Sequence, residues 1–441
     1  MRLFKHPLLR DERVLIALAL LLGFIGRSLW ALHYHNGMGE AQNAAIGLAT
    51  NGYISDVYRP KGTVFWPDGL PSAHLLPIPI GIAAAVYKVT GIETAASTVL
   101  LTLIAIATTF TGYLLLYRLF KTLGLTKFFR LGAMLTLCLV LLNAHLETED
   151  FRFWEGGYAV AGMAAFLLML YQMDGQLRIS WMSIAAVALL NALLFFISPQ
   201  FGIGGYVCLA LFSFRRLTKA RWATMAVACI AALALFIGPW ALRNQRVMGH
   251  PILLRSNLGL ELALAFNDNA LNPDQGEGFK DQLFSIHPNA DDNSYARMRL
   301  AGGEVAYANL LGAQTYEWVK QHPFSTAKLA VQHLISYVFP QPWMLTIYYA
   351  RGPNFFDYIR IAIFWLVSLF GLAGLFICLV QDWRKFQYIA AMIIVSSSPY
   401  AIVQPILRYH YNLFGLLIFF SFFLFESIYS KIRSSPLSYR P

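Results

Sequence analysis

The chain has 441 residues, of which 57% are hydrophobic and only 13% are charged, whereas about a quarter of the residues in soluble domains are charged. This composition, with a mean hydropathy of +0.53, excludes an ordinary soluble domain and indicates a polytopic membrane protein. The formal net charge of +11 is concentrated in short connectors, as in cytoplasmic loops, so it does not indicate a nucleic-acid-binding surface.

Ten apolar segments are long enough, or nearly long enough, to cross a bilayer. In chain order we predict spanning helices at residues 14–32, 97–117, 131–144, 156–172, 181–197, 201–214, 222–241, 359–380, 386–403 and 409–429. The two shortest would rise only about 21 Å against a hydrocarbon core of about 30 Å. We therefore expect these two helices to extend beyond the apolar run or to lie in a locally thinned bilayer.

A further apolar run, residues 75–89, decides the topology. If it crossed the membrane, every later loop would change sides, and the basic loops 118–130 and 214–221 would face outwards, against the positive-inside rule. The run is also short and contains Pro77 and Pro79, which disfavour a straight spanning helix. We therefore predict an interfacial or re-entrant segment on the outer face, with both termini in the cytoplasm.

This topology divides the chain into three parts. Residues 1–241 form an N-terminal transmembrane module, whose outer loops 33–96 and 145–155 are expected to carry the chemistry. Residues 242–358 form an outer-face cap with two predicted helices, and residues 359–441 form the C-terminal transmembrane helices. The predicted fold class is all-α, with about ten transmembrane helices, interfacial helices in the first outer loop and a small helical cap; the predicted cap helices span residues 296–321 and 324–338.

One carboxylate stands out in the first outer loop. Glu40 follows the first apolar segment, is the only acid between Glu12 and Asp56, and precedes an Ala-rich stretch that ends at Gly52 and Tyr53. An acid at a membrane exit, followed by a short amphipathic helix, is suited to chemistry at a lipid surface. The alternative is a solvated loop acid, or a charge that complements the dipole of a helix N-terminus.

Four passages form a pattern with this acid: residues 39–53, the Pro-rich residues 66–91, residues 239–259, and residues 404–411 with their Arg-Tyr pair. In their order and common side they resemble the GT-C superfamily of integral-membrane glycosyltransferases, in particular protein O-mannosyltransferases and lipid A aminoarabinose transferases. The resemblance implies a GT-C-like fold and transfer of a sugar from a polyprenyl-phosphate carrier to an acceptor hydroxyl or amine. It also implies that Glu40 is the catalytic base or a group that orients the acceptor, although many relatives have Asp or Asp-Glu at this position.

The implied reaction needs few groups. A lipid phosphate leaves as a stable anion, so it requires cations near its oxygens, and the acceptor requires a base, which one carboxylate can supply. We expect Glu40 to be this base in a direct, inverting displacement, and Arg408, at the start of a spanning helix, to hold the donor phosphate. The alternative for Arg408 is an ordinary snorkelling residue. The other outer-face candidates for the phosphate are Arg59, Lys61, Arg243, Arg255 and His410.

The second outer loop is unusually acidic, with Glu147, Glu149, Asp150 and Glu155 next to a membrane. Such acids are costly unless they are solvated, paired or bound to a cation. Three interpretations stay open: a solvated loop, a carboxylate site for Mg²⁺ or Mn²⁺, or a role for Glu149 or Asp150 in holding the acceptor. The Trp-Trp-Asp signature of metal-dependent oligosaccharyltransferases is absent, and no cofactor is assigned.

The expected partners are a polyprenyl-phosphate sugar donor, a lipid, glycan or protein acceptor, and membrane lipid, with no nucleic acid. The expected location is a bacterial inner membrane, with the active site on the periplasmic face. Two other classes stay open. A transporter or flippase for a lipid-linked substrate would place ionisable residues deep in helices, whereas the charges here are expected at helix ends. A non-catalytic envelope-assembly scaffold would not bring an acid and a base together over a lipid groove.

Overall fold

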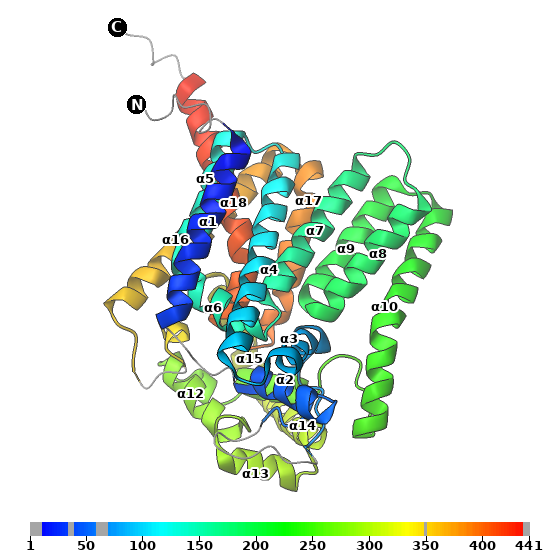
Figure 1. The fold of residues 1–441 in the computed structure, drawn as a ribbon, viewed down its shortest axis with the longest axis vertical. Helices are drawn as coiled ribbons and strands as arrows, with labels where there is room; N and C mark the ends of the chain where they lie inside the picture. Colours follow the sequence, from blue (N-terminus) through cyan, green and yellow to red (C-terminus); the bar gives the residue numbers. More distant parts are fainter. Residues whose placement is uncertain (1–10, 34–38, 59–68, 348–350, 435–441) are drawn as a thin grey trace.

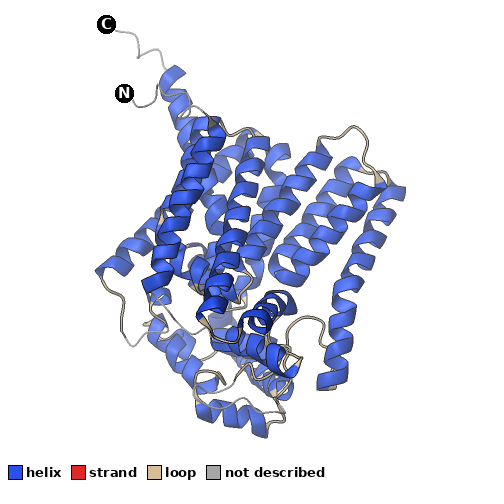
Figure 2. Ribbon diagram, viewed as in Figure 1, coloured by secondary structure: helices blue, strands red, loops and turns tan. Residues whose placement is uncertain are grey.

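The computed structural model describes residues 11–33, 39–58, 69–347 and 351–434. In these ranges the regular secondary structure is helical (Figure 2), and one isolated bridge joins Ser55 to Pro71. The all-α fold class predicted from the sequence is therefore confirmed.

Seven helical segments in the described part of the chain are long and apolar enough to cross a membrane. Many of their leucines are exposed, as lipid-facing side chains are, so the chain is an integral membrane protein. The segments are α1 (Glu12–His33), α4 (Ala95–Thr122), α5 (Lys127–Leu139) continued by α6 (Ala144–Thr148), α7 (Gly156–Asp174), α10 (Lys219–Met248), α16 (Phe355–Gln381) and α18 (Leu407–Ser434).

Three of the ten predicted spans correspond to helices that are not among these seven segments, because they are too short or not apolar enough. They are α8 (Trp181–Ile197), α9 (Pro199–Arg216) and α17 (Trp383–Ser397). Helix α8 packs against α10, and α9 packs against α17, so all three run in the same bundle as the longer helices (Figure 1). The number of ten crossings stays a prediction.

Close packing in the bundle depends on small residues, because lipid supplies no hydrophobic force between helices. A Cβ atom at Gly371 of α16 would lie 2.6 Å from the carbonyl oxygen of Leu417, and one at Gly374 would lie 2.0 Å from that of Phe420. Glycine therefore lets α16 and α18 approach at backbone distance. This contact fixes α18, whose first turn carries Arg408.

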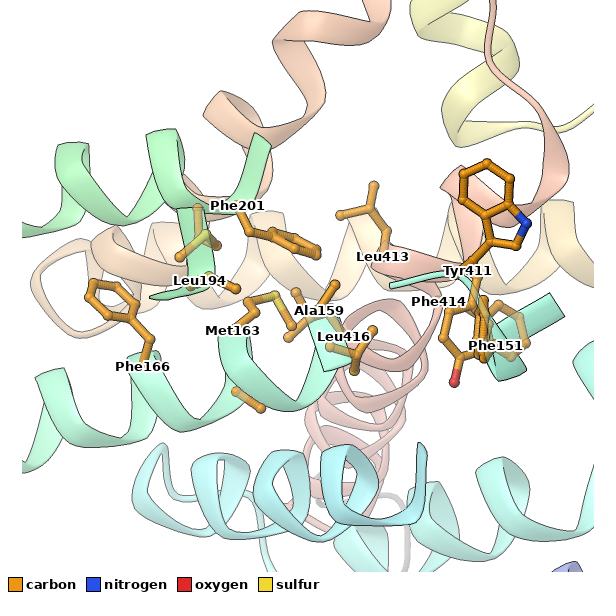
Figure 3. Close-up of a cluster of buried hydrophobic side chains, with 14 of the residues drawn as sticks. Phe151, Ala159, Met163, Phe166, Leu194, Phe201, Tyr411, Leu413, Phe414 and Leu416 are labelled. Atoms are coloured by element: carbon orange, nitrogen blue, oxygen red, sulfur yellow. The ribbon is translucent and has the colours of Figure 1, made fainter. Parts of the chain in front are cut away.

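A second set of buried contacts joins the bundle to the second outer loop. Figure 3 shows side chains of α7, α8, α9 and α18 packed together, with Phe151 of the loop beside Tyr411. The rings of Phe151 and Tyr411 are 4.8 Å apart at their centroids. The loop turns there through the short 3₁₀ helices η3 (Leu141–Asn143) and η4 (Asp150–Arg152). This packing holds the acidic loop against the start of α18.

The first outer loop folds into two short helices, α2 (Gly39–Asn51) and α3 (Pro77–Thr90). They pack on each other at one end of the bundle (Figure 1). Helix α3 corresponds to the run at 75–89 and has 14 residues, which rise only about 21 Å. Proline opens this helix, and Gly91, at a φ of 88°, follows its end. The expected short helices of the first outer loop are thus present.

The two ends of the bundle differ. Helix α1 begins and α18 ends at the upper end in Figure 1, where Arg130 Nη2 lies 2.7 Å from Glu12 Oε1. At the basic end of α9, Arg215 Nη2 lies 3.2 Å from Asp174 Oδ2 of α7. Helices α2, α3 and the cap lie at the opposite end. The predicted grouping of the outer loops on one side therefore agrees with this arrangement.

The cap contains more helices than the two predicted. The predicted helix at 296–321 is divided into two at Gly302 and Gly303, whose φ angles of 97° and 109° no α-helix accommodates. That prediction of one continuous helix was wrong. The cap helices are α11 (Leu258–Ala265), α12 (Gln275–Ile286), α13 (Asp292–Leu300), α14 (Glu304–Gln321) and α15 (Pro323–Val338). Short 3₁₀ helices lie at η5 (Asn269–Leu271), η6 (Pro342–Leu345) and, before α18, η7 (Ser398–Ala401).

Candidate functional site

Glu40 lies in the first turn of α2, next to a glycine that the backbone requires. Gly39 has a φ of +53°, in the left-handed region that disfavours side chains. A Cβ atom there would also lie 3.0 Å from Asn289 Nδ2 of the cap. The Gly39-Glu40 pair therefore starts α2 where the cap approaches it, and the positive end of the helix dipole favours the carboxylate.

Two histidines hold the Glu40 carboxylate. Glu40 Oε2 lies 3.1 Å from His74 Nε2, and Glu40 Oε1 lies 3.1 Å from His287 Nε2. His74 directly precedes the region that leads into α3, and His287 directly follows α12 in the cap. The carboxylate side chain is only 12% exposed, so these contacts are largely shielded from water. Parts of the chain far apart in sequence meet at this one acid.

The surroundings keep Glu40 ionised. Burial by itself would raise the pKa of Glu40, but His74, His287 and the positive charge of Arg408 outweigh burial and lower this pKa to about 2. Burial lowers the pKa of His287 below its ordinary value, and this effect exceeds the opposing attraction of Glu40. The site therefore holds a carboxylate anion beside a histidine whose pKa is lowered.

Arg408 extends this site to the start of α18. The centre of its guanidinium group lies 3.8 Å from the ring centroid of Trp154 in the second outer loop. Its charge lowers the pKa of Glu40 and also opposes the rise in the pKa of Asp150. The structure thus brings Glu40, Arg408 and the second outer loop into one electrostatic neighbourhood at the end of the bundle.

Two other predicted phosphate ligands, Arg255 and Arg243, make contacts within the protein. Arg255 Nη2 lies 3.0 Å from Glu155 Oε1. Arg243 Nη1 and Nη2 donate to the carbonyl oxygens of Ser72 at 2.8 Å and Ile54 at 3.0 Å, which ties the first outer loop to α10. These bonds give Arg243 a structural role. Arg59 and Lys61 lie outside the described residues.

His410, also predicted to bind the phosphate, points into the packing of α18 rather than to an exposed surface. Its side chain is buried, and Nδ1 lies 2.9 Å from the carbonyl oxygen of Tyr337 in α15. The ring also makes an edge contact with Phe364 of α16. His410 therefore contributes to the packing of α18 against α15 and α16.

Glu147 lies in a buried ion pair of the bundle. Its Oε2 lies 2.6 Å from Arg27 Nε, both side chains are 1% exposed, and Tyr113 donates to its other oxygen. Arg27 also donates to three carbonyl oxygens, including that of Cys138 at 2.7 Å. The expectation that charges lie only at helix ends was wrong for Arg27, because α1 buries it against these acceptors.

The other acids of the second outer loop differ from one another. Glu149 Oε1 accepts a hydrogen bond from Trp30 Nε1 at 3.3 Å. Burial raises the pKa of Asp150 to about 6, although Arg408 and Arg152 oppose this shift. In the described part of the chain, no three His, Cys, Asp or Glu residues gather in a geometry that could hold a metal ion. A site for Mg²⁺ or Mn²⁺ in this loop stays a prediction from the sequence.

Sequence reasoning missed several residues that build the site. Glu304, at the start of α14, accepts hydrogen bonds from Ser72 Oγ at 2.7 Å, from Ala73 N at 2.7 Å and from Ser256 Oγ at 2.6 Å. It thereby fixes the segment that carries His74. For His74 the sequence offered a weak signal, because this residue lies in one of the passages that carried the family resemblance. For His287 the sequence offered no signal, because its contact with Glu40 depends on how the cap folds back over the first outer loop.

No family model matches the chain, and no curated protein matches it. Among solved structures, the chain is similar to the oligosaccharyltransferase AglB from Archaeoglobus fulgidus in complex with an inhibitory peptide and a dolichol-phosphate. The TM-score is 0.54 and the identity 13%, over 96% of this chain and 51% of that chain; the apo form gives the same values. ArnT from Cupriavidus metallidurans bound to undecaprenyl phosphate has a TM-score of 0.36 and 13% identity, over 97% and 80% of the two chains.

The likeness to AglB concerns the fold. It extends over nearly the whole of this chain, which spans about half the length of that oligosaccharyltransferase. The chain therefore shares the fold of that oligosaccharyltransferase, which agrees with the fold that the sequence resemblance implied.

Proposed function

We propose that the protein is a membrane glycosyltransferase that takes its sugar from a polyprenyl-phosphate carrier. The observation that carries this proposal is the buried anionic carboxylate of Glu40, held near the cation Arg408 where the bundle meets its outer loops. The shared fold supports it, because AglB was solved with a dolichol-phosphate. This pair provides the two groups that the transfer requires, a base for the acceptor and a cation for the leaving phosphate.

Arg408 is suited to the donor phosphate. A guanidinium group offers a planar fork of donors that matches phosphate oxygens. Stacking on Trp154 orients this plane. Arg408 also lies in the first turn of the 28-residue helix α18, where the helix dipole favours an anion. A lipid phosphate at this membrane boundary would interact with both the guanidinium group of Arg408 and the positive end of the α18 dipole.

Glu40 is suited to the acceptor. In the proposed step, the acceptor oxygen or nitrogen forms a bond to the anomeric carbon while the bond from that carbon to the phosphate oxygen breaks. The electron pair of the broken bond leaves with the lipid phosphate, and the acceptor proton passes to Glu40. Because the acceptor becomes more acidic as its new bond forms, a carboxylate with a low pKa can still receive this proton. Attack opposite the leaving group gives inversion.

The proposed side of the reaction follows from the topology. The basic connectors, the start of α1 and the end of α18 lie away from α2, the helix that carries Glu40 (Figure 1), and basic loops favour the cytoplasm. Glu40 would then work on the outer face, which is the periplasmic face if the host membrane is a bacterial inner membrane. The acceptor is a lipid, glycan or protein exposed on that side.

The donor class can be tested by binding. Undecaprenyl phosphate is titrated into the purified protein, and complexes are measured by native mass spectrometry. We expect the wild type to bind the lipid. Arg408→Gln should bind it at least about tenfold more weakly, because a charged hydrogen bond is worth about 1.5–3 kcal/mol. The control Lys320→Gln, at an exposed lysine of the cap, should bind the lipid as the wild type does. Absence of binding to the wild type would contradict the proposal. A transporter would also bind the lipid, so sugar transfer is measured separately.

A further inference from the structure

The hydrogen bonds around His287 define which of its nitrogens carries a proton. The backbone N–H of Asn289 donates to His287 Nδ1 at 3.2 Å. A backbone N–H can only donate, so Nδ1 must be the acceptor and Nε2 must carry the hydrogen of the neutral ring. Nε2 is the nitrogen that lies 3.1 Å from Glu40 Oε1. The cap therefore fixes the tautomer that places the Nε2–H next to the carboxylate.

The turn that holds His287 is tied at both sides. The backbone N–H of His287 donates to the carbonyl oxygen of Leu283, in the last turn of α12, at 2.9 Å. Asp291 then caps α13 by accepting from Ser294 N at 2.9 Å. Asn289 lies between these anchors, and its side chain approaches Gly39, the residue before Glu40. Two separate contacts thus connect this cap turn to the start of α2.

His74 makes the matching arrangement at the other carboxylate oxygen. The Tyr58 hydroxyl lies 2.7 Å from His74 Nδ1, so a proton on Nε2 lets His74 donate to Glu40 while it accepts from Tyr58. Ser72 Oγ also accepts from His74 N at 3.0 Å. Glu40 therefore receives a hydrogen bond from its own loop and a close contact from the cap.

We infer that His287 is a positioning residue through which the cap completes the active site. Its Nε2–H lies against Glu40 Oε1 and so favours one orientation of the carboxylate toward the acceptor. If Glu40 is the base, as proposed above, loss of this contact leaves donor binding intact and slows the chemical step. Misplacement of a catalytic group by about 1 Å can cost about 100-fold in rate.

A pH dependence follows from the same bonds. A proton added to His287 Nδ1 would meet the N–H of Asn289, so the positively charged ring cannot keep this arrangement. The charged or titratable groups that act on His287 are Glu40 and Glu261, which favour its protonation, and His74 and Arg408, which oppose it; the ring of Tyr58 lies 5.8 Å away. We expect the rate of transfer to fall on the acid side as His287 is protonated.

The test compares His287→Ala with His287→Gln, whose amide nitrogen can replace Nε2–H but does not titrate. His250→Ala, at an exposed histidine of the same loop, is the control. We expect kcat for sugar transfer to fall about 10- to 100-fold in His287→Ala, with KM for the donor within about twofold. We expect His287→Gln to recover most of kcat and to lose the acid-side fall.

A double-mutant cycle separates positioning from general stabilisation. If His287 acts through Glu40, adding His287→Ala to Glu40→Ala should not lower the residual single-turnover rate further. The inference is overturned if His287→Ala keeps full kcat, if it lowers the rate equally in the Glu40→Ala background, or if His287→Gln is as slow as His287→Ala. Should His287→Ala not fold, as judged by thermal melting, the kcat and pH profile of His287→Gln decide. Full transfer by Glu40→Ala would instead overturn the proposed function itself.

Discussion

Glu40 Oε1 lies 3.1 Å from His287 Nε2, so the first outer loop and the cap meet at one carboxylate. Near the same carboxylate, Arg408 brings in the start of α18, and Trp154, against Arg408, brings in the second outer loop. Four separate parts of the chain therefore have to fold before this site exists.

Gly39→Ala should reduce both stability and transfer. A non-glycine residue in the left-handed region costs about 1–2 kcal/mol, and the added Cβ would lie 3.0 Å from Asn289 Nδ2. Gly249→Ala is a matched control, because Gly249 has a φ of +74° and nothing within 4 Å of its Cβ position. Thermal melting should show a loss in both variants, and transfer should fall only in Gly39→Ala. Equal transfer in the two variants would show that the contact with the cap is unimportant.

Arg408→Lys should weaken donor binding although it keeps the charge. Lysine has neither the planar fork of donors nor the flat group that stacks on Trp154. We expect the Kd for undecaprenyl phosphate to rise about tenfold, which corresponds to about 1.4 kcal/mol. Lys431→Arg, near the opposite end of α18, is the control. A Kd unchanged from that of the wild type would exclude shape-dependent recognition by Arg408.

Asp150→Asn should make the protein more stable at neutral pH. The pKa of Asp150 rises from 3.8 to about 6 on folding, chiefly through burial, so the folded state binds more protons than the unfolded state between these values. Stability contributed by Asp150 therefore falls as the pH rises from about 4 to about 6. Melting temperatures measured across this window should decline less in Asp150→Asn than in the wild type. Parallel pH curves for the two proteins would contradict this assignment.

Breaking the buried pair of Arg27 and Glu147 should destabilise the bundle strongly. Removal of one partner leaves the other charged and buried, at a cost of about 3–5 kcal/mol. We expect Arg27→Met and Glu147→Gln each to lower the melting temperature in detergent. The double variant should lose much less than the sum of the two losses, because neither charge is then left alone. Additive losses would indicate that the two residues act independently.

The sequence predicted the features that depend on local pattern. Long apolar runs gave the positions of the bundle helices, and Pro77 and Pro79 with the basic loops indicated the short helix α3. Glu40 was found because it is an isolated acid beside an apolar run. The division between α13 and α14 was missed, since the conformation of Gly302 and Gly303 is not visible from periodicity.

The partners of Glu40 could not be predicted in the same way. His287 reaches it only because the cap folds back over the first outer loop, which is a long-range event with no local signature. Arg27 is the one charged residue in the apolar run 14–32, and its burial depends on Glu147 from another helix. Conversely, Arg243 and His410 were proposed from their side of the membrane alone, and the structure shows carbonyl oxygens as their neighbours.

The most direct measurement is the rate of sugar transfer by Glu40→Gln, with donors from a panel of undecaprenyl-phosphate-linked sugars that the wild type uses. Because the pKa of Glu40 is about 2, the wild-type carboxylate is ionised throughout the working pH range, and the neutral amide cannot take up the acceptor proton. We predict that kcat falls at least about 100-fold, that undecaprenyl phosphate still binds, and that Glu317→Gln, at an exposed glutamate, transfers as the wild type. Full transfer by both Glu40→Gln and Glu40→Ala would contradict the assignment of Glu40 as the base.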